Sequence, residues 1–293
     1  MKLRPPRIED AGATAQVIAA RSEADLGVVE ITSATLRDEW GLSEIDLGAN
    51  ARLVEDETDR VIGYGILRDV GAYAVISPNA EGSGAGSLLL DWLEQRSREL
   101  GRSVHRQLVA STNQTGSALL SARGYRLAWS EHRMVRPLAG GIVIRDVDGV
   151  TVRPLEFSDL EAIHAVDGRA FAGDPGYVPE SLAKFREAHL EAHDSAPGLS
   201  RVALAGDRVA GFLIARRWEN RSTGYVDLLA VDPDHHGRGI GHALLLDAFT
   251  AFAAAGLTEA QLSVSSVNPR ALALYRSAGM TPRFRHDIYQ RPT

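Results

Sequence analysis

The sequence of 293 residues predicts an α/β fold that occurs twice along the chain. Three observations lead to this prediction. Strand and helix patterns follow one another in the same order in both halves. In each half a glycine-rich loop joins a strand pattern to an apolar helix pattern. Landmarks around these loops recur 155 positions apart in one register over about 50 residues, which indicates an internal duplication of domain size.

The repeat is clearest around the two loops. Ile76 to Ser87, ISPNAEGSGAGS, aligns with Val231 to His242, VDPDHHGRGIGH. The aligned pairs are Pro78 and Pro233, Gly84 and Gly239, Gly86 and Gly241, Gly101 and Gly256, Asn113 and Asn268, Ala118 and Ala273, Leu119 and Leu274, and Gly124 and Gly279. From this alignment we predict one domain over 1–138, a linker over 139–149 and a second domain over 150–293.

The first part of each half predicts a strand, two helices and a strand pair joined by a polar turn. The first helix of the second half should begin at Ser158, because Ser158 and Glu161 have the spacing of a capping box. In the first half the expected ranges are 1–5, a helix from Asp10, 35–40, 51–54 and 61–68. Their counterparts are 150–155, a helix from Ser158, 179–193, 201–205 and 209–217.

The second part of each half predicts a strand that enters the glycine loop, a long helix, another strand and a shorter helix. Gly101 and Gly256 stand where the long helices should stop. Asn268 precedes Pro269, which predicts an N-cap followed by proline at the first helical position. The expected ranges are strands 72–77 and 104–111 with a short helix ending near Gly124, and strands 225–231 and 259–266 with one ending near Gly279.

Composition excludes several classes of protein. Hydrophobic residues make up 44% and charged residues 24%, which is typical of a globular protein. No apolar run approaches the roughly 20 residues of a membrane span, and the first residues show no secretory signal. The absence of cysteine excludes disulfides, thiolate nucleophiles and thiolate metal sites, and it fits a cytoplasmic location. A net charge of −6 without a basic stripe argues against nucleic acid and favours a cationic or amine-bearing substrate.

The loop of the second half has the features of an anion site. Gly237, Gly239 and Gly241 alternate just before an apolar helix. Such a loop directs backbone N–H groups and the positive end of the helix at one point, which suits a pyrophosphate. A Rossmann motif would need glycine or alanine where His242 or Leu244 stands, and no Gly-Lys-(Ser/Thr) occurs for a Walker A loop.

This loop resembles the acyl-CoA loop of the GNAT acetyltransferase superfamily, (Gln/Arg)-x-x-Gly-x-(Gly/Ala), with His236, Gly239 and Gly241 at the three defined positions. His236 departs from the pattern but can still donate a hydrogen bond. The resemblance covers nearly the whole chain and implies two tandem GNAT domains, each a mixed, mostly antiparallel twisted sheet flanked by helices. It also implies acetyl-CoA as cofactor, bound by Leu229, Ala230, Val231, His236, Gly237, Arg238, Gly239, Ile240, Gly241, His242, Asn268 and Tyr275. The two-domain plan and the segment 170–175 are also similar to those of mycothiol synthases, without assigning a substrate.

The resemblance implies catalytic residues as well. Asn268, Ala271, Leu274, Tyr275 and Gly279 follow the family's last helix, whose tyrosine faces the cofactor sulfur. A phenol with a pKa of about 10 can protonate the departing thiolate.

Asp227 and Tyr225, on the strand that enters the loop, are the candidate bases. Strand alternation places Asp227 on one face with Leu229 and Val231. The alternative for Asp227 is a structural contact with a neighbouring strand or turn.

The first half keeps the fold pattern and loses the chemistry. Leu120 stands where the second half has Tyr275, Ala72 where it has Asp227, and Glu81 where it has His236. A carboxylate at position 81 would repel a pyrophosphate unless it turned to solvent. We therefore predict that 1–138 is a degenerate GNAT domain, with acetyl-CoA binding there left open.

No metal site is expected. His189 and His193 share a helix face, but Leu190 occupies the position that a zinc protease would give to glutamate.

These observations predict an acetyl-CoA-dependent N-acetyltransferase that acts on the primary amine of an unidentified small molecule. Without cysteine there can be no acetyl-cysteine intermediate, so the amine should attack directly in a ternary complex. The oxyanion would be met by a backbone N–H near 229–231, with pantetheine lying alongside like an added strand. Two alternatives stay open: a peptide or protein N-terminal acetyltransferase, and a non-catalytic acyl-CoA-binding or sensing module. The sequence does not indicate an oligomeric state.

Overall fold

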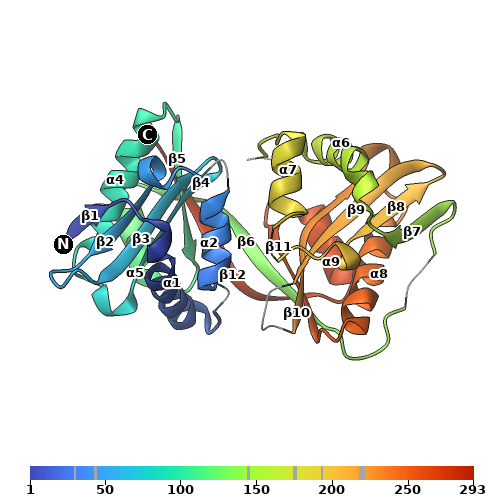
Figure 1. Ribbon diagram of the computed structural model, residues 1–293, viewed down its shortest axis with the longest axis horizontal. Helices are drawn as coiled ribbons and strands as arrows, with labels where there is room; N and C mark the ends of the chain where they lie inside the picture. The colour runs from blue at the N-terminus through green and yellow to red at the C-terminus, as the bar shows by residue number, and fades with distance from the viewer. Residues whose placement is uncertain (30, 43–44, 144–145, 174–176, 193, 218–221) are drawn as a thin grey trace. The chain divides into compact units, whose positions relative to one another are not determined.

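The computed structural model describes the chain except residues 30, 43–44, 144–145, 174–176, 193 and 218–221. It consists of two compact units, which are described separately (Figure 1). Unit 1 contains residues 1–131 and 284–293, and unit 2 contains residues 132–283. Each unit holds one mixed sheet with helices against it.

The sheet of unit 1 has the strand order β1-β2-β3-β4-β5-β12. Only β4 and β5 pair in parallel; the other recorded pairs are antiparallel. The strands are β1 Lys2–Arg4, β2 Ala51–Glu55, β3 Val61–Arg68, β4 Gly71–Ile76, β5 Val104–Ala110 and β12 Thr281–Pro292, of which 284–292 belong to this unit. The helices are α1 Ala11–Leu26, α2 Ser33–Gly41, α3 Leu47–Asn50, α4 Ala85–Glu99 and α5 Gln114–Ala122.

The sheet of unit 2 repeats this plan with the order β6-β11-β10-β9-β8-β7. The parallel pair here is β10 with β11, and β7, β8, β9 and β10 form antiparallel pairs in turn. The strands are β6 Arg126–Pro137, of which 132–137 belong to this unit, β7 Val150–Pro154, β8 Arg201–Ala205, β9 Arg208–Arg217, β10 Thr223–Val231 and β11 Glu259–Ser265. The helices are α6 Leu160–Phe171, α7 Leu182–His189, α8 Ile240–Ala254 and α9 Pro269–Ser277. The predicted mixed, mostly antiparallel sheet flanked by helices is confirmed.

The last strand of each sequence half completes the sheet of the other unit. In β12, His286–Pro292 pairs with Val104–Ala110 of β5 in unit 1. In unit 2, β6 is the neighbour of β11. The compact units therefore exchange their last strands relative to the sequence halves 1–138 and 150–293. This exchange was not predicted, because sequence periodicity identifies the faces of a strand but not the sheet edge with which the strand pairs.

The sheet of unit 2 lies between two helical layers. Phe249 and Phe252 of α8 are fully buried and pack on one face of the sheet, together with Leu213 of β9. Phe185 of α7 packs on the opposite face, with Phe212 next to Leu213 along the strand. Successive residues of β9 thus point to opposite layers, and both faces of this central strand are apolar for that reason.

The start of each unit shows the duplication in atomic detail. Arg4 forms a bidentate ion pair with Asp10, with N···O distances of 2.7 and 2.8 Å. Arg153 and Asp159 repeat it in unit 2 at 2.8 and 2.8 Å.

The predicted capping box at Ser158 is wrong. A 3-10 turn over Phe157–Asp159 precedes α6, and the carboxylate of Asp159 accepts the N–H of Glu156 at 2.9 Å. The helix therefore begins two residues later than expected, at Leu160.

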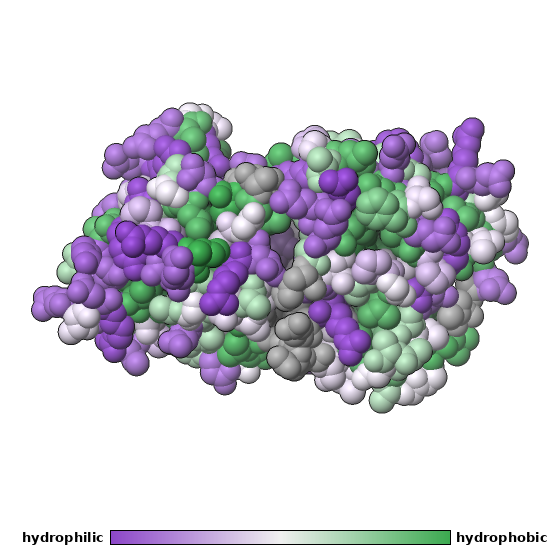
Figure 2. All heavy atoms as spheres, viewed as in Figure 1, coloured by the Kyte–Doolittle hydropathy of each residue, from purple (hydrophilic) through white to green (hydrophobic). Residues whose placement is uncertain are grey.

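The visible surface mixes residue types (Figure 2). Hydrophilic residues are distributed over both units in this view, and the green hydrophobic residues lie between them. Within the described part of the chain, none of the helices has the length and hydropathy needed to cross a membrane.

Candidate active site

The glycine loop of unit 2 leaves a helix end open to a ligand. Gly237 and Gly239 adopt left-handed φ angles of 79° and 85°, which glycine adopts without strain. Gly241 lies inside α8, where an added Cβ would stand 3.1 Å from Cδ2 of Leu274. Gly239 is the N-cap of α8 and offers no side-chain cap. The first N–H groups of α8 can therefore donate hydrogen bonds to an anion.

A cavity of about 380 Å³ lies at this loop. Except for Arg238, every residue predicted to bind the cofactor lines it. Its lining residues are Ala170, Phe171, Leu229, Ala230, Val231, His235, His236, Gly237, Gly239, Ile240, Gly241, His242, Asn268, Arg270, Ala271, Leu274 and Tyr275.

The edge of β10 opens beside this cavity. The parallel register of β10 with β11 runs from Thr223 and Glu259 to Val226 and Leu262. Beyond it, β10 continues in register with β9 as far as Val231. A strand that leaves its parallel neighbour exposes main-chain groups along that edge, which an extended ligand can pair with.

His236 is occupied by contacts within the protein. Its Nδ1 lies 2.8 Å from Nη1 of Arg270, and its Nε2 lies 2.9 Å from the carbonyl oxygen of Val231. Because a guanidinium can only donate, Nδ1 must accept, and the ring proton is on Nε2. In this arrangement the N–H of His236 is directed at the carbonyl oxygen of Val231, and its role in binding the cofactor stays a prediction.

Arg270 is the residue that sequence reasoning missed. It stands at the second position of α9 and lines the cavity, beside His236. A cation in the first turn of a helix opposes the helix dipole, so its position there already suggests a role other than helix stability. Arg270 brings to the loop the positive charge that the family pattern places at the position of His236.

Arg238 is not among the described residues that line the cavity. Its Nη2 donates to the carbonyl oxygen of Asp148 at 2.8 Å, and its Nη1 lies 3.0 Å from Nδ1 of His235. It therefore connects the loop to the segment before β7.

Tyr275 lies on α9, lines the cavity and is 8% exposed. Burial raises the pKa of its phenol well above the ordinary value, and the nearby Tyr225 raises it further. The phenol thus keeps its proton at neutral pH. Asn268 caps this helix, as predicted, by accepting the N–H of Ala271 at 2.9 Å.

Tyr225 contacts a cation of β6. The guanidinium of Arg133 lies 4.9 Å from the centre of its ring. Tyr225 contributes to the raised pKa of Tyr275, but like Asp227 it is not among the described residues that line the cavity.

Asp227 is engaged in ion pairs. Its Oδ2 lies 2.6 Å from Nδ1 of His189, and its Oδ1 lies 3.0 Å from Nε of Arg216. Burial would raise the pKa of Asp227, but these two partners lower it below its usual range. A carboxylate so stabilised is a weak base. Among the described residues it is also not part of the cavity lining.

A β-bulge in β10 explains this placement. The register with β9 shifts between Val226 and Leu228. Val226, Leu229 and Val231 consequently pack in the layer of α8, while Leu228 packs in the layer of α6 and α7. The expectation that Asp227 shares a face with Leu229 and Val231 is therefore wrong, because the extra residue interrupts the alternation.

His189 has both ring nitrogens near carboxylates. Its Nε2 lies 3.4 Å from Oε2 of Glu180, on the side opposite Asp227. Burial alone would lower the pKa of His189, but the two carboxylates raise it to about 9. His193, with which it was paired in the metal alternative, and 174–176 lie outside the described residues.

The comparisons with known proteins agree with this geometry. The model of the acetyltransferase (GNAT) family matches residues 162–280. The chain is 31% identical over 265 residues to the mycothiol acetyltransferase of Thermomonospora curvata, which covers 87% of this chain and 86% of that protein. It is 30% identical over 220 residues to that of Actinosynnema mirum, with 74% and 73% covered.

Solved structures show the same fold over both units. A GCN5-related N-acetyltransferase from Sphaerobacter thermophilus has a TM-score of 0.81 at 24% identity and covers 99% of this chain and 95% of its own. A tandem GNAT protein from the clavulanic acid biosynthesis pathway has a TM-score of 0.78 at 15% identity, with 99% and 98% covered. The chain therefore belongs to the GNAT acetyltransferase family, as a tandem GNAT protein, and it is an N-acetyltransferase that uses an acyl-CoA.

Proposed function

We propose that unit 2 transfers the acetyl group of acetyl-CoA to the primary amine of a small molecule by direct attack in a ternary complex. The observation that carries this proposal is the single cavity that joins the open end of α8, the free edge of β10 and the phenol of Tyr275. The pyrophosphate binds at the first N–H groups of α8 beside Arg270. Pantetheine then extends along β10 at 229–231, which directs the thioester toward Tyr275.

The reaction follows from these placements. The neutral amine nitrogen attacks the thioester carbonyl carbon, and a backbone N–H near 229–231 hydrogen-bonds to the oxyanion that forms. The intermediate collapses with cleavage of the carbon–sulfur bond. Tyr275 gives its proton to the departing thiolate and regains one from solvent. The amide product carries the acetyl group, and the proton lost by the amine leaves to solvent.

Tyr225 and Asp227, the two candidate bases, differ in their contacts. The ion pairs of Asp227 support a structural role for this carboxylate, whereas Tyr225 acts electrostatically on Tyr275 by raising the pKa of its phenol. We infer that Tyr225 orients the acceptor amine or a water molecule that takes the proton of the amine. Asp227 stabilises the bulge of β10 through its ion pairs.

The relatives suggest which acceptor to try first. Those at 30% and 31% identity are mycothiol acetyltransferases, so the amine substrate of such enzymes heads the panel. A peptide with a free N-terminus represents the alternative acceptor class. We also infer a cytoplasmic location, since the chain has no cysteine.

Calorimetric titration of the full chain with acetyl-CoA tests the proposal. One site per chain is expected, followed by release of CoA thiol when the amine is added. No binding would contradict the proposed function, and two sites would show that unit 1 also binds the cofactor. Turnover with the peptide and not with the small amine would favour the alternative acceptor.

A further inference from the structure

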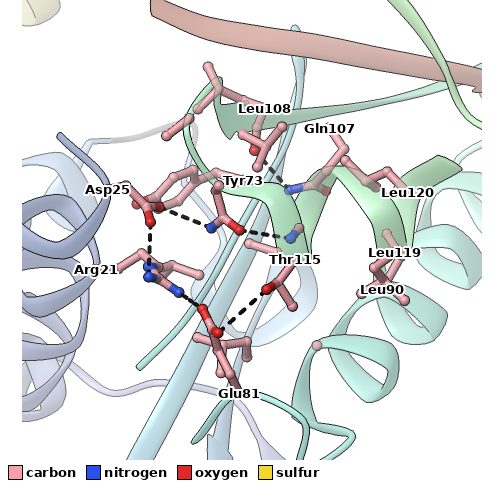
Figure 3. Close-up of a pocket in the computed structure, with 18 of the residues that line it drawn as sticks. Arg21, Asp25, Tyr73, Glu81, Leu90, Gln107, Leu108, Thr115, Leu119 and Leu120 are labelled. Atoms are coloured by element: carbon pink, nitrogen blue, oxygen red, sulfur yellow. Dashed lines mark hydrogen bonds and ion pairs between the residues drawn. The ribbon is translucent and has the colours of Figure 1, made fainter. Parts of the chain in front are cut away.

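Unit 1 holds a cavity of about 270 Å³ at the position that corresponds to the cavity of unit 2 (Figure 3). Gly82 and Gly84 have φ angles of 74° and 90°, close to those of Gly237 and Gly239. Corresponding residues line the two cavities: Val75 and Ala230, Ile76 and Val231, Gly86 and Gly241, Asn113 and Asn268, Leu119 and Leu274, and Leu120 and Tyr275. The shape of a ligand site is thus kept in unit 1.

The anion end of this cavity is changed. Glu81 stands where unit 2 has His236, and Figure 3 shows it directed at Arg21 and Thr115. Arg21 forms an ion pair with it, and Oγ1 of Thr115, the counterpart of Arg270, lies 3.5 Å from its Oε2. Oγ of Ser83 accepts the N–H of Ala85 at 3.3 Å, which occupies one donor of α4. The carboxylate of Glu81 therefore occupies the position that the pyrophosphate of an acyl-CoA would need.

Two carboxylates share one guanidinium at this end of the cavity. Arg21 also pairs with Asp25 at 2.9 Å. Asp25 receives a further hydrogen bond, from Nδ2 of Asn113 at 3.0 Å. Even so, burial raises the pKa of Asp25 more than Arg21 and Asn113 lower it. An added cation would stabilise this group of side chains.

An independent observation comes from β5. Gln107 is 4% exposed and lines the cavity; its Oε1 has no donor in hydrogen-bond geometry, although its side chain interacts electrostatically with His105 on the same strand. Unit 2 has the apolar Leu262 at this position. A buried carbonyl without a donor costs free energy that a ligand N–H would recover. The remaining wall beside Gln107 is apolar, formed by Leu90, Leu119 and Leu120.

We propose that the cavity of unit 1 binds a small apolar amine in its ammonium form instead of an acyl-CoA. Such a ligand brings the three properties that the cavity requires. Its charge balances Asp25 and Glu81, its N–H groups reach acceptors, and its hydrocarbon part covers the leucine wall. This proposal does not depend on the proposed function of unit 2.

Calorimetry on the full chain tests it with n-hexylamine as the probe, and with hexan-1-ol and hexanoate as controls of equal chain length. One hexylammonium per chain is expected, with hexan-1-ol at least about tenfold weaker and hexanoate not bound. Glu81→Gln and Gln107→Leu keep side-chain size and should each weaken hexylammonium binding several-fold. Glu99→Gln, at the C-terminal end of α4 and outside the cavity lining, should change nothing.

Other outcomes overturn the proposal. Equal affinity for the amine and the alcohol would leave no role for the carboxylates. Amine binding that survives both Glu81→Gln and Gln107→Leu would place the site elsewhere, and no binding at millimolar amine would exclude it. A second acetyl-CoA per chain that Gly84→Val removes would show that unit 1 kept its original ligand. Acetyl-CoA binding in unit 2 can succeed or fail independently of all these results.

Discussion

Arg270 donates a hydrogen bond of 2.8 Å to Nδ1 of His236 at the mouth of the glycine loop. The pair joins the first turn of α9 to the loop before α8, two segments that are distant in the sequence. The histidine positions the guanidinium, and the guanidinium supplies the charge. The two residues together take the place of the single Gln or Arg at the first position of the family pattern.

Arg270→Ala is expected to weaken acetyl-CoA binding about tenfold to a hundredfold, since a hydrogen bond to a charged group contributes roughly 1.5 to 3 kcal/mol. Calorimetry gives the dissociation constant, and the rate at saturating acetyl-CoA should change little. Arg238→Ala is the matched control from the loop itself, because Arg238 donates to Asp148 instead. A larger loss with Arg238→Ala would contradict the assignment.

His236→Arg in the Arg270→Ala background should recover most of the lost affinity. The new arginine restores the residue that the family pattern has at that position. The salt dependence of the dissociation constant checks the mechanism. When a cation contacts the phosphates, the dissociation constant rises more steeply with salt concentration. If the double variant binds no better than Arg270→Ala, the two residues do not form one site.

Tyr275→Phe should lower kcat about a hundredfold or more while leaving the dissociation constant of acetyl-CoA unchanged, because the variant lacks only the proton for the thiolate. Steady-state rates and calorimetry on the same preparation separate the two effects. Tyr225→Phe serves as the comparison on the neighbouring phenol. Unchanged turnover in Tyr275→Phe would remove this residue from the mechanism.

Gly239→Val and Gly84→Val form a matched pair at equivalent helix N-caps, with φ angles of 85° and 90°. A branched side chain strains both loops alike. We expect that only Gly239→Val abolishes acetyl-CoA binding, as seen by titration. Equal loss in both variants would mean that the two loops share one ligand or one folding defect, which circular dichroism distinguishes.

The ion pair of Asp227 and His189 predicts a pH-dependent stability. The folded pKa of His189 is raised to about 9, so its contribution is complete below the unfolded value of about 6.5 and is lost as pH rises through 9. The folded pKa of Asp227 is lowered, so its contribution is present above its unfolded value and is lost only as pH falls through the folded one.

Urea unfolding at a series of pH values measures this effect. The free energy of unfolding should fall by roughly 2 to 3 kcal/mol between about pH 6.5 and 9 in the wild type, and much less in His189→Gln. Asp227→Asn should cost about 3 kcal/mol at neutral pH, because it removes one carboxylate from each of two buried cations and leaves His189 only Glu180 and Arg216 only Asp194. If Asp227→Asn keeps full stability and loses turnover, Asp227 is the base after all.

The local parts of this fold could be predicted from sequence. The glycine loops, the long helices behind them and the N-cap at Asn268 depend on residues close together in the chain, and the structure has them where expected. Asp227 shows the limit of such reasoning. Its partners His189 and Arg216 come from α7 and β9, and one extra residue in β10 reverses the face on which it lies.

Arg270 and the exchanged strands were missed for the same physical reason. The contact of Arg270 with His236 forms only when α9 packs beside the loop, and motif spacing within one segment does not describe it. The sheet neighbours of β6 and β12 depend on which edges are available once the rest has folded.

The position of β12 also determines when unit 1 can complete its fold during synthesis. A ribosome that has released residues 1–131 has not yet made 284–293, the segment that covers the edge of β5 in unit 1. The edge of β5 therefore stays unpaired and exposed until all of 132–283 has been synthesised. Loss of the last ten residues would damage the unit that contains the first residue of the chain, and the two sequence halves could not be separated into independent proteins by a single cut.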